Sequence, residues 1–418
     1  MQKILIKNVL LAGSVKDILI AGNTVSRIGS DLNTDSAEII NGSGLAALPA
    51  LYNMHTHTAM SLFRGYADDM ALMPWLQEKI WPQESKLTEE DVYQGTRFGI
   101  LEMIKAGTVL ANDMYWHWKG EARAAQEMGI RFINGFTLID FHDEARLPEL
   151  KKDIQQQYED SSQYGELVEF SLAPHAVYTV SEKTLRWAAE FASEKQLKLH
   201  IHVSETEQEV IDCLRKTGLT PLQYLDKIGF LGNNVIAAHM VWLDDKDFDI
   251  VKKHNLTVAH CPVSNMKLSS GIFKYSEFLK RGIPVCVATD GPSSNNNLDL
   301  FEEMKFAAIL PKISMMNPEL AAAENILQTT TLNPAKALGL AAGEVKEGNL
   351  ADIILVDLDN INLIPNHNLS SNLVYSAHAD CVHTTICNGK ILMHNRRIKG
   401  EQEIIAGFRK TIEKLRKA

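Results

Sequence analysis

Cysteine is scarce in this chain of 418 residues. The five cysteines lie far apart and include no CxxC pair or other spacing typical of a disulfide framework or a zinc ribbon. An odd number of widely spaced cysteines indicates reduced thiols, so we expect a cytoplasmic protein. The five positions are Cys213, Cys261, Cys286, Cys381 and Cys387.

Long apolar runs and an excess of basic residues are also absent. Lys7 and Asn8 interrupt the apolar N-terminus before a signal-length core forms, and no later run approaches the roughly 18 apolar residues of a membrane span. The net charge of -10, without any Lys/Arg cluster, disfavours nucleic acid, because a polyanion would be repelled. We therefore expect neither a membrane nor a nucleic-acid partner.

Strand-like apolar segments alternate with amphipathic helical segments through the middle of the chain. Helix starts are marked by capping residues such as Thr88, with Asp91 three positions later, and Ser181. Eight such β/α units predict a TIM (β/α)8 barrel of the α/β class. The eight strand segments are the one that runs from about 46 to 57, then 109–112, 131–138, 168–173, 197–203, 235–239, 256–260 and 284–290.

Short strands joined by turns are expected at both ends of the chain. They cover residues 3–9, 15–20, 24–28, 351–357 and 384–392, and helices are expected from Leu298 and from Pro318. Because the barrel accounts for the middle, the two ends are predicted to form one small flanking β domain, a β-sandwich. The predicted boundaries are 1–48 with 350–400 for this domain, 49–349 for the barrel and 401–418 for a C-terminal helix.

The tripeptide His55-Thr56-His57 stands at the end of the first predicted barrel strand. Alternate side chains of a strand share a face, so both histidines can grip one metal ion, although random placement of 14 histidines gives about 0.5 such pairs. The other strand ends add weight, because barrel active sites lie at the carboxyl ends of the strands. They carry Asn112 and Asp113, residues 137–140, His175, His202, His239, His260 and Asp290.

Three histidines and one aspartate suit Zn²⁺ or Fe²⁺ with a position left open for water. A proton must then move from that water to the leaving group, and Glu205, three residues after His202, is placed to carry it. The alternative is that Glu205 is a solvated loop carboxylate beside Glu207 and Glu209. His200 shares a strand face with His202, and it is either a support for the ligands or a core residue.

Three motifs resemble those of the amidohydrolase superfamily: residues 49–57 at the first strand, 202–206 at the fifth and 288–296 at the eighth. Further segments are similar to the 5-methylthioadenosine/S-adenosylhomocysteine deaminases, and the resemblance spans essentially the whole chain. Those segments are 62–69, 75–76, 80–84, 264–271, 365–368 and 371–375.

The resemblance implies a hydrolytic deaminase of adenosine-type nucleosides that uses one divalent metal ion, with Zn²⁺ favoured and Fe²⁺ as the alternative. Glu205 would protonate a purine ring nitrogen, while His239 and Asp290 position and deprotonate the hydroxide that attacks C6. Ammonia then leaves, and the inosine analogue remains. The metal ligands implied by the family pattern are His55, His57, His202 and Asp290.

The resemblance also implies contacts to a small-molecule nucleoside. Glu84 would accept both ribose hydroxyls, His175 would donate to a purine nitrogen, and Arg146 would meet the 5′ tail. Many relatives have a second arginine where this chain reads Ile133-Asn134-Gly135-Phe136, so methylthioadenosine or adenosine is favoured over S-adenosylhomocysteine. The complete predicted set of substrate-binding residues is Trp81, Glu84, Arg146, His175, Glu205 and His239.

Three alternatives stay open. A guanine- or triazine-directed hydrolase would share the metal centre, and a non-catalytic metal-binding protein would need no acid or base beside it. The other zinc deaminase class is disfavoured because the chain lacks an H-x-E motif followed by P-C-x-x-C. A homo-oligomer is expected by analogy, whereas the sequence leaves the number of subunits, the metal, the preferred nucleoside and the meaning of Cys261 undetermined.

Overall fold

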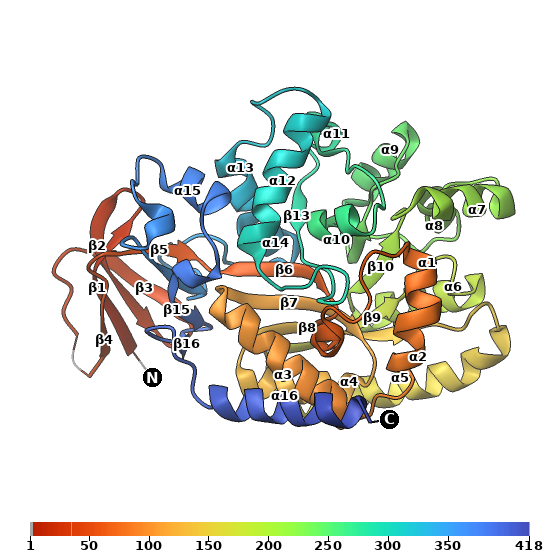
Figure 1. The fold of residues 1–418 in the computed structure, drawn as a ribbon, viewed down its shortest axis with the longest axis horizontal. Coiled ribbons are helices and arrows are strands. Elements are labelled where there is room, and N and C mark those ends of the chain that lie inside the picture. The colour runs from red at the N-terminus through yellow and green to blue at the C-terminus, as the bar shows by residue number, and fades with distance from the viewer. Residues whose placement is uncertain (1–2, 35, 418) are drawn as a thin grey trace.

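The computed structural model describes residues 3–34 and 36–417, and its larger part is a barrel of eight parallel strands (Figure 1). The strands follow one another in chain order from β6 to β13. The two ends of this series meet where Asp290 N–H donates to the His55 carbonyl at 3.0 Å. The predicted TIM barrel is confirmed, with strands β6 (Leu51–Thr56), β7 (Thr108–Tyr115), β8 (Arg131–Leu138), β9 (Val168–Pro174), β10 (Leu199–Val203), β11 (Val235–His239), β12 (Thr257–His260) and β13 (Val285–Val287).

The apolar run before His55 is divided between two sheets, so its prediction as one strand is wrong. β5 (Leu45–Pro49) pairs with β14 (Ile353–Asp357) in the smaller sheet, and β6 begins after Ala50 and pairs with β7. Both halves are apolar, and all but Leu48 and Pro49 are buried, so the hydrophobic pattern continues across the change of sheet. β6 ends at Thr56, and His57 precedes the short helix η1 (Thr58–Phe63).

Helix starts follow the capping residues. Thr88 and Ser181 cap α3 (Glu89–Lys105) and α6 (Glu182–Lys195) as predicted. The helix expected from Leu298 is α12 (Leu300–Ser314), with Asp299 as its cap. The expected start at Pro318 is wrong, because an Asn317 side chain accepts from Glu319 N–H in a turn, and α13 (Ala323–Gln328) follows it.

The remaining helices connect the strands or lie near the chain ends (Figure 1). They are α1 (Leu72–Pro74), η2 (Trp75–Ile80), α2 (Trp81–Glu84), α4 (Trp118–Met128), η3 (Glu144–Arg146), α5 (Leu147–Ser161), α7 (Glu207–Thr217), α8 (Pro221–Lys227), α9 (Asp245–His254), α10 (Pro262–Lys267), α11 (Tyr275–Lys280), α14 (Leu332–Ala337), η4 (Ile361–Leu363), α15 (Leu369–Tyr375), η5 (Ala379–Cys381) and α16 (Glu401–Leu415).

Both chain ends contribute to one mixed sheet at the side of the barrel (Figure 1). Its order is β16-β15-β14-β5-β1-β2-β3, and β4 pairs with β1. Isoleucines such as Ile4, Ile18 and Ile353 form a core of its own. The other strands are β1 (Lys3–Leu11), β2 (Ser14–Ala21), β3 (Thr24–Gly29), β4 (Glu38–Asn41), β15 (Val382–Cys387) and β16 (Lys390–Met393).

A buried aspartate joins this sheet to the barrel. Asp352 accepts from the Tyr52 hydroxyl at 2.6 Å and from Arg131 Nε at 2.8 Å, and both partners lie on barrel strands. Its other oxygen accepts from Asn388 N–H at 2.6 Å in the small sheet. Burial, followed by the charge of Asp352, raises the pKa of Tyr52, which therefore stays a neutral donor.

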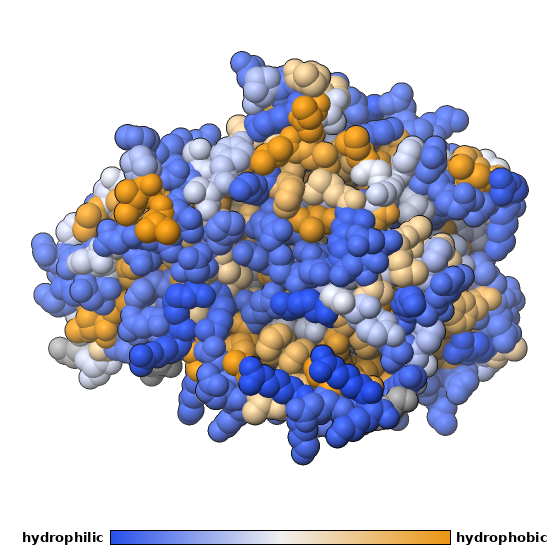
Figure 2. Space-filling model, in the orientation of Figure 1, coloured by the Kyte–Doolittle hydropathy of each residue, from blue (hydrophilic) through white to orange (hydrophobic). Residues whose placement is uncertain are grey.

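The C-terminal helix α16 runs alongside α3 on the outside of the barrel (Figure 1). Phe408 stacks on Phe98 with 3.9 Å between ring centroids, and Lys414 binds the Asp91 carboxylate at 2.7 Å. The face seen in Figure 2 is mostly hydrophilic, with separate small hydrophobic patches. Within the described ranges, no helix has both the length and the apolar character needed to cross a membrane.

Candidate active site

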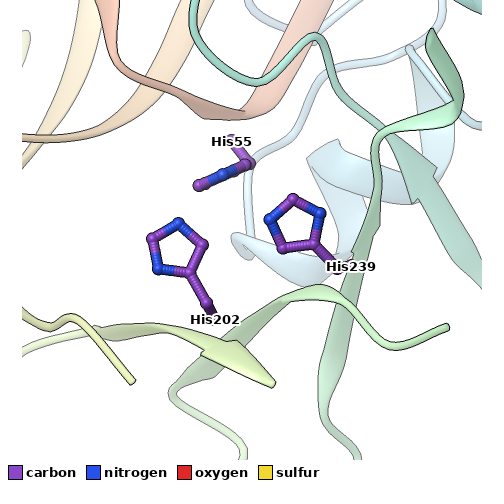
Figure 3. Close-up of side chains that lie close together, drawn as sticks. All are labelled: His55, His202 and His239. Atoms are coloured by element: carbon purple, nitrogen blue, oxygen red, sulfur yellow. The ribbon is translucent and has the colours of Figure 1, made fainter. Parts of the chain in front are cut away.

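Five predicted site residues converge at the carboxyl end of the barrel. His55 and His57 come from the end of β6, His202 from β10, His239 from β11 and Asp290 from just beyond β13. Asp290 Oδ1 lies 3.2 Å from His55 Nε2 and 3.3 Å from His57 Nε2, and His202 Nε2 lies 3.4 Å from His57 Nε2. Figure 3 shows the rings of His55, His202 and His239 gathered around one point.

The imidazole rings are oriented by hydrogen bonds at their far nitrogens. His57 Nδ1 lies 2.5 Å from the Met114 carbonyl, and His202 Nδ1 lies 2.8 Å from the His175 carbonyl. A carbonyl can only accept, so each Nδ1 carries a hydrogen and each Nε2 points to the centre. Burial alone would lower the pKa of His57, but its hydrogen bond to the Asp290 carboxylate raises it to about 9, so binding of a metal ion by His57 requires loss of its Nε2 proton. His55 Nδ1 lies 2.8 Å from His200 Nε2, so His200 supports His55 rather than only filling the core.

The geometry and chemistry of the cluster fit a divalent metal ion. His55 Nε2 is buried and has no hydrogen-bond partner among the residues that the structure describes. Two groups of three residues share His55, and within each group the possible ligand atoms lie within 4.8 Å of one another. The first group is His55, His202 and His239, and the second is His55, His57 and Asp290. Burial lowers the pKa of His55 to about 4 and that of His202 well below its usual value, so both are neutral, as ligands must be.

Asp290 is held on both sides of its carboxylate. Oδ2 accepts from the hydroxyls of Ser264 at 2.6 Å and Ser294 at 3.1 Å, while Oδ1 faces His55 and His57. Burial alone would raise its pKa, but the two histidines hold the pKa of this carboxyl well below its usual range. Asp290 is therefore an ionised group aimed at the cluster.

Glu205 lies beside the cluster and is almost fully buried, with 4% of its surface exposed. Its Oε2 is 3.7 Å from His239 Nε2, and its Oε1 accepts from the Ser270 hydroxyl at 3.1 Å. Burial raises the pKa of this carboxyl, which favours its neutral, proton-carrying form more than in an ordinary glutamate. The alternative of a solvated loop carboxylate is wrong for Glu205.

His239 is oriented from behind by an amide. Its Nδ1 lies 2.9 Å from Asn265 Oδ1, so Nδ1 donates and Nε2 faces Glu205. His260 has a different setting, because its ring stacks on Phe273 at 3.9 Å between centroids and it belongs to neither ligand group. Cys261 is buried with its sulfur 3.8 Å from the Ala259 carbonyl and does not line the active-site cavity.

An aromatic cavity opens above the cluster. Trp75, Trp81, Trp116 and Tyr178 line it, and Glu84 and His175 lie in its wall. Burial lowers the pKa of His175 to about 3, so its ring is neutral and can donate or accept a hydrogen bond. Its Nδ1 lies 2.9 Å from the Thr179 hydroxyl.

Glu84 is buried and only half satisfied. Its Oε2 accepts from Trp116 Nε1 at 3.1 Å, whereas Oε1 has no hydrogen-bond partner within residues 3–34 and 36–417. Burial raises the pKa of this carboxyl, and the hydrogen bond from Trp116 opposes that rise. A buried acceptor without a partner is costly, so Glu84 is suited to a ligand that brings donors.

A second pocket continues outward from the first. It shares Trp81, Glu84, Trp116 and Ile139 with the inner cavity and extends to Phe141 and Arg146. Arg146 is exposed and forms no ion pair in the described part of the chain. The predicted substrate-binding residues are therefore split between a buried inner cavity and an exposed outer pocket.

Residues 133–136, where the family resemblance directed attention to a second arginine, lie within β8 and are mostly buried. Asn134 is buried, and its Nδ2 donates to the Trp118 carbonyl at 2.9 Å. A Cβ on the neighbouring Gly135 would lie 2.6 Å from the Asp113 carbonyl and 2.7 Å from the Ala173 Cβ. The outer pocket consequently has Arg146 as its one guanidinium among the residues that line it.

Sequence reasoning missed the polar residues that hold the site. Ser264, Asn265 and Ser270 belong to a segment that was noticed only for its resemblance, and Ser294 belongs to another. Each contacts Asp290, His239 or Glu205. A run of small hydroxyl and amide residues directly after two strand ends was the available signal.

Comparisons with known proteins agree with this geometry. The sequence pattern of the amidohydrolase family matches residues 46–392. The 5-methylthioadenosine/S-adenosylhomocysteine deaminase of Thermococcus sibiricus is 45% identical, with 94% of each chain covered. The 5′-deoxyadenosine deaminase of Methanospirillum hungatei is also 45% identical, with 94% of this chain and 89% of the relative covered.

A solved structure of similar shape is an adenosine deaminase from Xanthomonas campestris with bound zinc. It has a TM-score of 0.91 and 30% identity, and the match covers 100% of this chain and 99% of that one. The match to the family pattern extends over most of the chain and includes the strand ends that carry the cluster. The chain belongs to the amidohydrolase family.

Proposed function

We propose that this protein is a metal-dependent hydrolytic deaminase that converts adenosine-type nucleosides to their inosine analogues and ammonia. The observation that carries the proposal is a buried carboxyl, Glu205, 3.7 Å from His239 beside three histidines and an aspartate. The names of the relatives, which are deaminases of 5′-substituted or unsubstituted adenosines, support it.

One divalent ion would be held by His55, His57, His202 and Asp290. Nitrogen and oxygen donors in this ratio suit zinc, and the related solved structure carries zinc, although Fe²⁺ accepts the same ligands. When bound, such an ion supplies a water whose pKa is lowered toward neutrality. Metal analysis of purified protein by mass spectrometry tests both the occupancy and the identity.

Glu205 is the proton carrier in this proposal. Its neutral carboxyl donates to the ring nitrogen next to C6, which prepares that carbon for addition of a water oxygen. His239 and the ionised Asp290 orient the water and accept its proton. The C6–N bond then breaks as the amino group takes up the proton accepted from the water and leaves as ammonia. The added hydroxyl returns its proton to Glu205 as the C6 carbonyl forms, so one water is consumed and one ammonia is released.

The cavity residues bind the nucleoside in an order that follows the pocket outward. His175 donates to a purine nitrogen, Trp81 covers the base or sugar, and Glu84 accepts the two ribose hydroxyls with the oxygen that lacks a protein partner. His239 and Glu205 contact the reacting end of the purine. Arg146 faces the 5′ substituent at the exposed end.

The outer pocket favours an uncharged 5′ substituent. Trp81, Trp116 and Phe141 offer apolar surface, and a single exposed guanidinium holds a carboxylate less firmly than a pair. We therefore propose methylthioadenosine, 5′-deoxyadenosine or adenosine as preferred substrates over S-adenosylhomocysteine.

We also propose that the enzyme is a cytoplasmic homo-oligomer that does not bind nucleic acid. The five free, buried cysteines support the cytoplasmic location, and the net charge of -10 supports the absence of nucleic-acid binding. Light scattering coupled to size-exclusion chromatography gives the number of subunits. A gel-shift assay with duplex DNA and RNA tests whether the protein binds nucleic acid.

A substrate panel tests the central proposal. Ammonia release is measured with adenosine, methylthioadenosine, 5′-deoxyadenosine, S-adenosylhomocysteine and guanine, and chloride release is measured with a chlorotriazine. We expect turnover of the adenosine derivatives and none of the other two, because guanine and triazines have no ribose diol for Glu84. Activity restricted to guanine or the triazine would replace the proposal with that alternative.

Glu205→Gln separates catalysis from metal binding. The amide keeps the size of the side chain but cannot deliver the proton, so we expect kcat to fall by about 10²- to 10⁴-fold while metal content stays at the wild-type level. Retained turnover in a metal-loaded Gln variant would contradict the assignment.

A further inference from the structure

The turn that carries Glu205 is stabilised by a second glutamate. Glu209, in the first turn of α7, accepts from Ser204 N–H through Oε1 at 3.0 Å and from Glu205 N–H through Oε2 at 2.8 Å. It is buried, with 7% of its surface exposed. Both carboxylate oxygens are therefore committed to two consecutive amides of the turn.

This contact differs from the usual cap of a helix. Thr206 caps α7 and accepts from Glu209 N–H, and a glutamate in this position commonly returns a bond to the N–H of the capping residue. Glu209 instead reaches past Thr206 to the two preceding residues. Its carboxylate therefore fixes the loop that leads out of β10 rather than the helix end alone.

The turn needs such support because its backbone is strained. Ser204 has φ of +52°, in the left-handed region that non-glycine residues rarely adopt. The Ser204 carbonyl accepts from Val241 N–H at 3.1 Å and Trp242 N–H at 2.9 Å, so the turn is tied to the loop after β11. Glu209 holds the amide side of the same turn.

We propose that Glu209 is a positioning residue for Glu205: it fixes the backbone from which the proton-carrying carboxyl projects toward His239. This inference rests on the proposed function. The other end of Glu205 is held by the Ser270 hydroxyl, so the side chain is anchored at both its backbone and its carboxyl group. A shift of about 1 Å in such a group lowers turnover by as much as about 10²-fold.

Glu209→Gln is the direct test, and Glu207→Gln is its matched control. Glutamine offers one acceptor oxygen and turns an NH₂ group toward a buried N–H, whereas Glu207 lies exposed in the same helical turn. With adenosine or methylthioadenosine, we expect kcat of Glu209→Gln to fall by about 10- to 100-fold. KM should stay within about threefold of wild type, metal content should not change, and the control should behave as wild type.

A double-mutant cycle with Glu205→Gln distinguishes positioning from general loss of structure. If Glu209 acts through Glu205, adding Glu209→Gln to Glu205→Gln causes no further loss in single-turnover rate. An equal fold-loss in both backgrounds, or a wild-type kcat in metal-loaded Glu209→Gln, would overturn the inference.

Glu209→Asp serves if the Gln variant does not fold. It keeps the charge but is one methylene too short to reach both amides, so kcat should again fall with KM preserved, and a change confined to KM would overturn the inference. Failure of the proposed function is distinguishable, because the wild-type enzyme would then be inactive with every adenosine derivative.

Discussion

The inner and outer halves of the active site are built in opposite ways. In the inner half, His57 and His202 lie at strand ends and each has its Nδ1 fixed by a backbone carbonyl. In the outer half, Phe141 lies in a loop and Arg146 ends the short helix η3 within the same connection. Both are exposed, and Arg146 has no ion-pair partner in the described chain. Rigid strands thus fix the chemistry, and loops are free to set the substrate.

Removal of an inner ligand should have the largest effect. His202→Ala deletes one donor from the cluster and leaves Glu205 in place, so we expect metal content to fall and kcat to drop below about 10⁻⁴ of wild type. Metal analysis and ammonia release measure the two quantities on one preparation. Full metal content with full activity would mean that the inner half does not depend on this ligand.

Glu84, where the two halves meet, should have an intermediate effect. Glu84→Gln weakens hydrogen bonds from the ribose hydroxyls, and bonds to a charged acceptor contribute about 1.5–3 kcal/mol each, so we expect KM for adenosine to rise by about 10- to 100-fold. The control is 2′,3′-dideoxyadenosine, whose KM should not respond to the substitution. An equal rise for both nucleosides would assign Glu84 to another contact.

The same residue predicts a pH dependence. Burial raises the pKa of the Glu84 carboxyl, so the group takes up a proton at a higher pH than an ordinary glutamate as the solution is acidified. The affinity that depends on the ionised form is present above this pKa and is lost as pH falls through it. The ratio of kcat/KM for adenosine to that for the dideoxy control should therefore decline on acidification, and Glu84→Gln should abolish the decline.

Arg146 should have the smallest effect and should act on one substrate. An exposed charge pair contributes about 0.2–1 kcal/mol, so Arg146→Ala should raise KM for S-adenosylhomocysteine by no more than about fivefold. The KM for 5′-deoxyadenosine should stay the same, which makes that nucleoside the internal control. A large rise in KM for both nucleosides would show that Arg146 has a structural role in the outer pocket and does not only contact the 5′ substituent.

The barrel and its cluster could be predicted because strand ends with histidine or aspartate are visible in the sequence. His55, His57, His202 and Asp290 follow short apolar segments, and the fold brings those ends together whatever the loops do. The predicted domain boundary between residues 48 and 49 lies close to the change of sheet at Ala50, but the interruption of the strand there could not be predicted, because residues on both sides are apolar. Hydrophobic periodicity predicts which residues are buried, but it does not predict which sheet a strand joins.

The contacts that orient His239 and Glu205 could not be predicted from the sequence either. Asn265 and Ser270 reach His239 and Glu205 from a different β/α unit, and Glu209 reaches backward to the amides of a turn. Such pairs depend on loop geometry, which local propensity does not define. Glu205 itself could be identified from its position three residues after His202 in the sequence, but its burial could not be predicted.

The antiparallel pairing of β5 with β14 has a consequence for the order of folding. β5 is synthesised before any barrel strand, yet its partner is made only after β13 is complete. During synthesis the edge of β5 that pairs with β14, and the apolar side chains around Leu45, therefore have no partner strand until the whole barrel has been made. A nascent chain arrested before Ile353 should therefore expose this edge to a chaperone, and release of β14 should end that exposure.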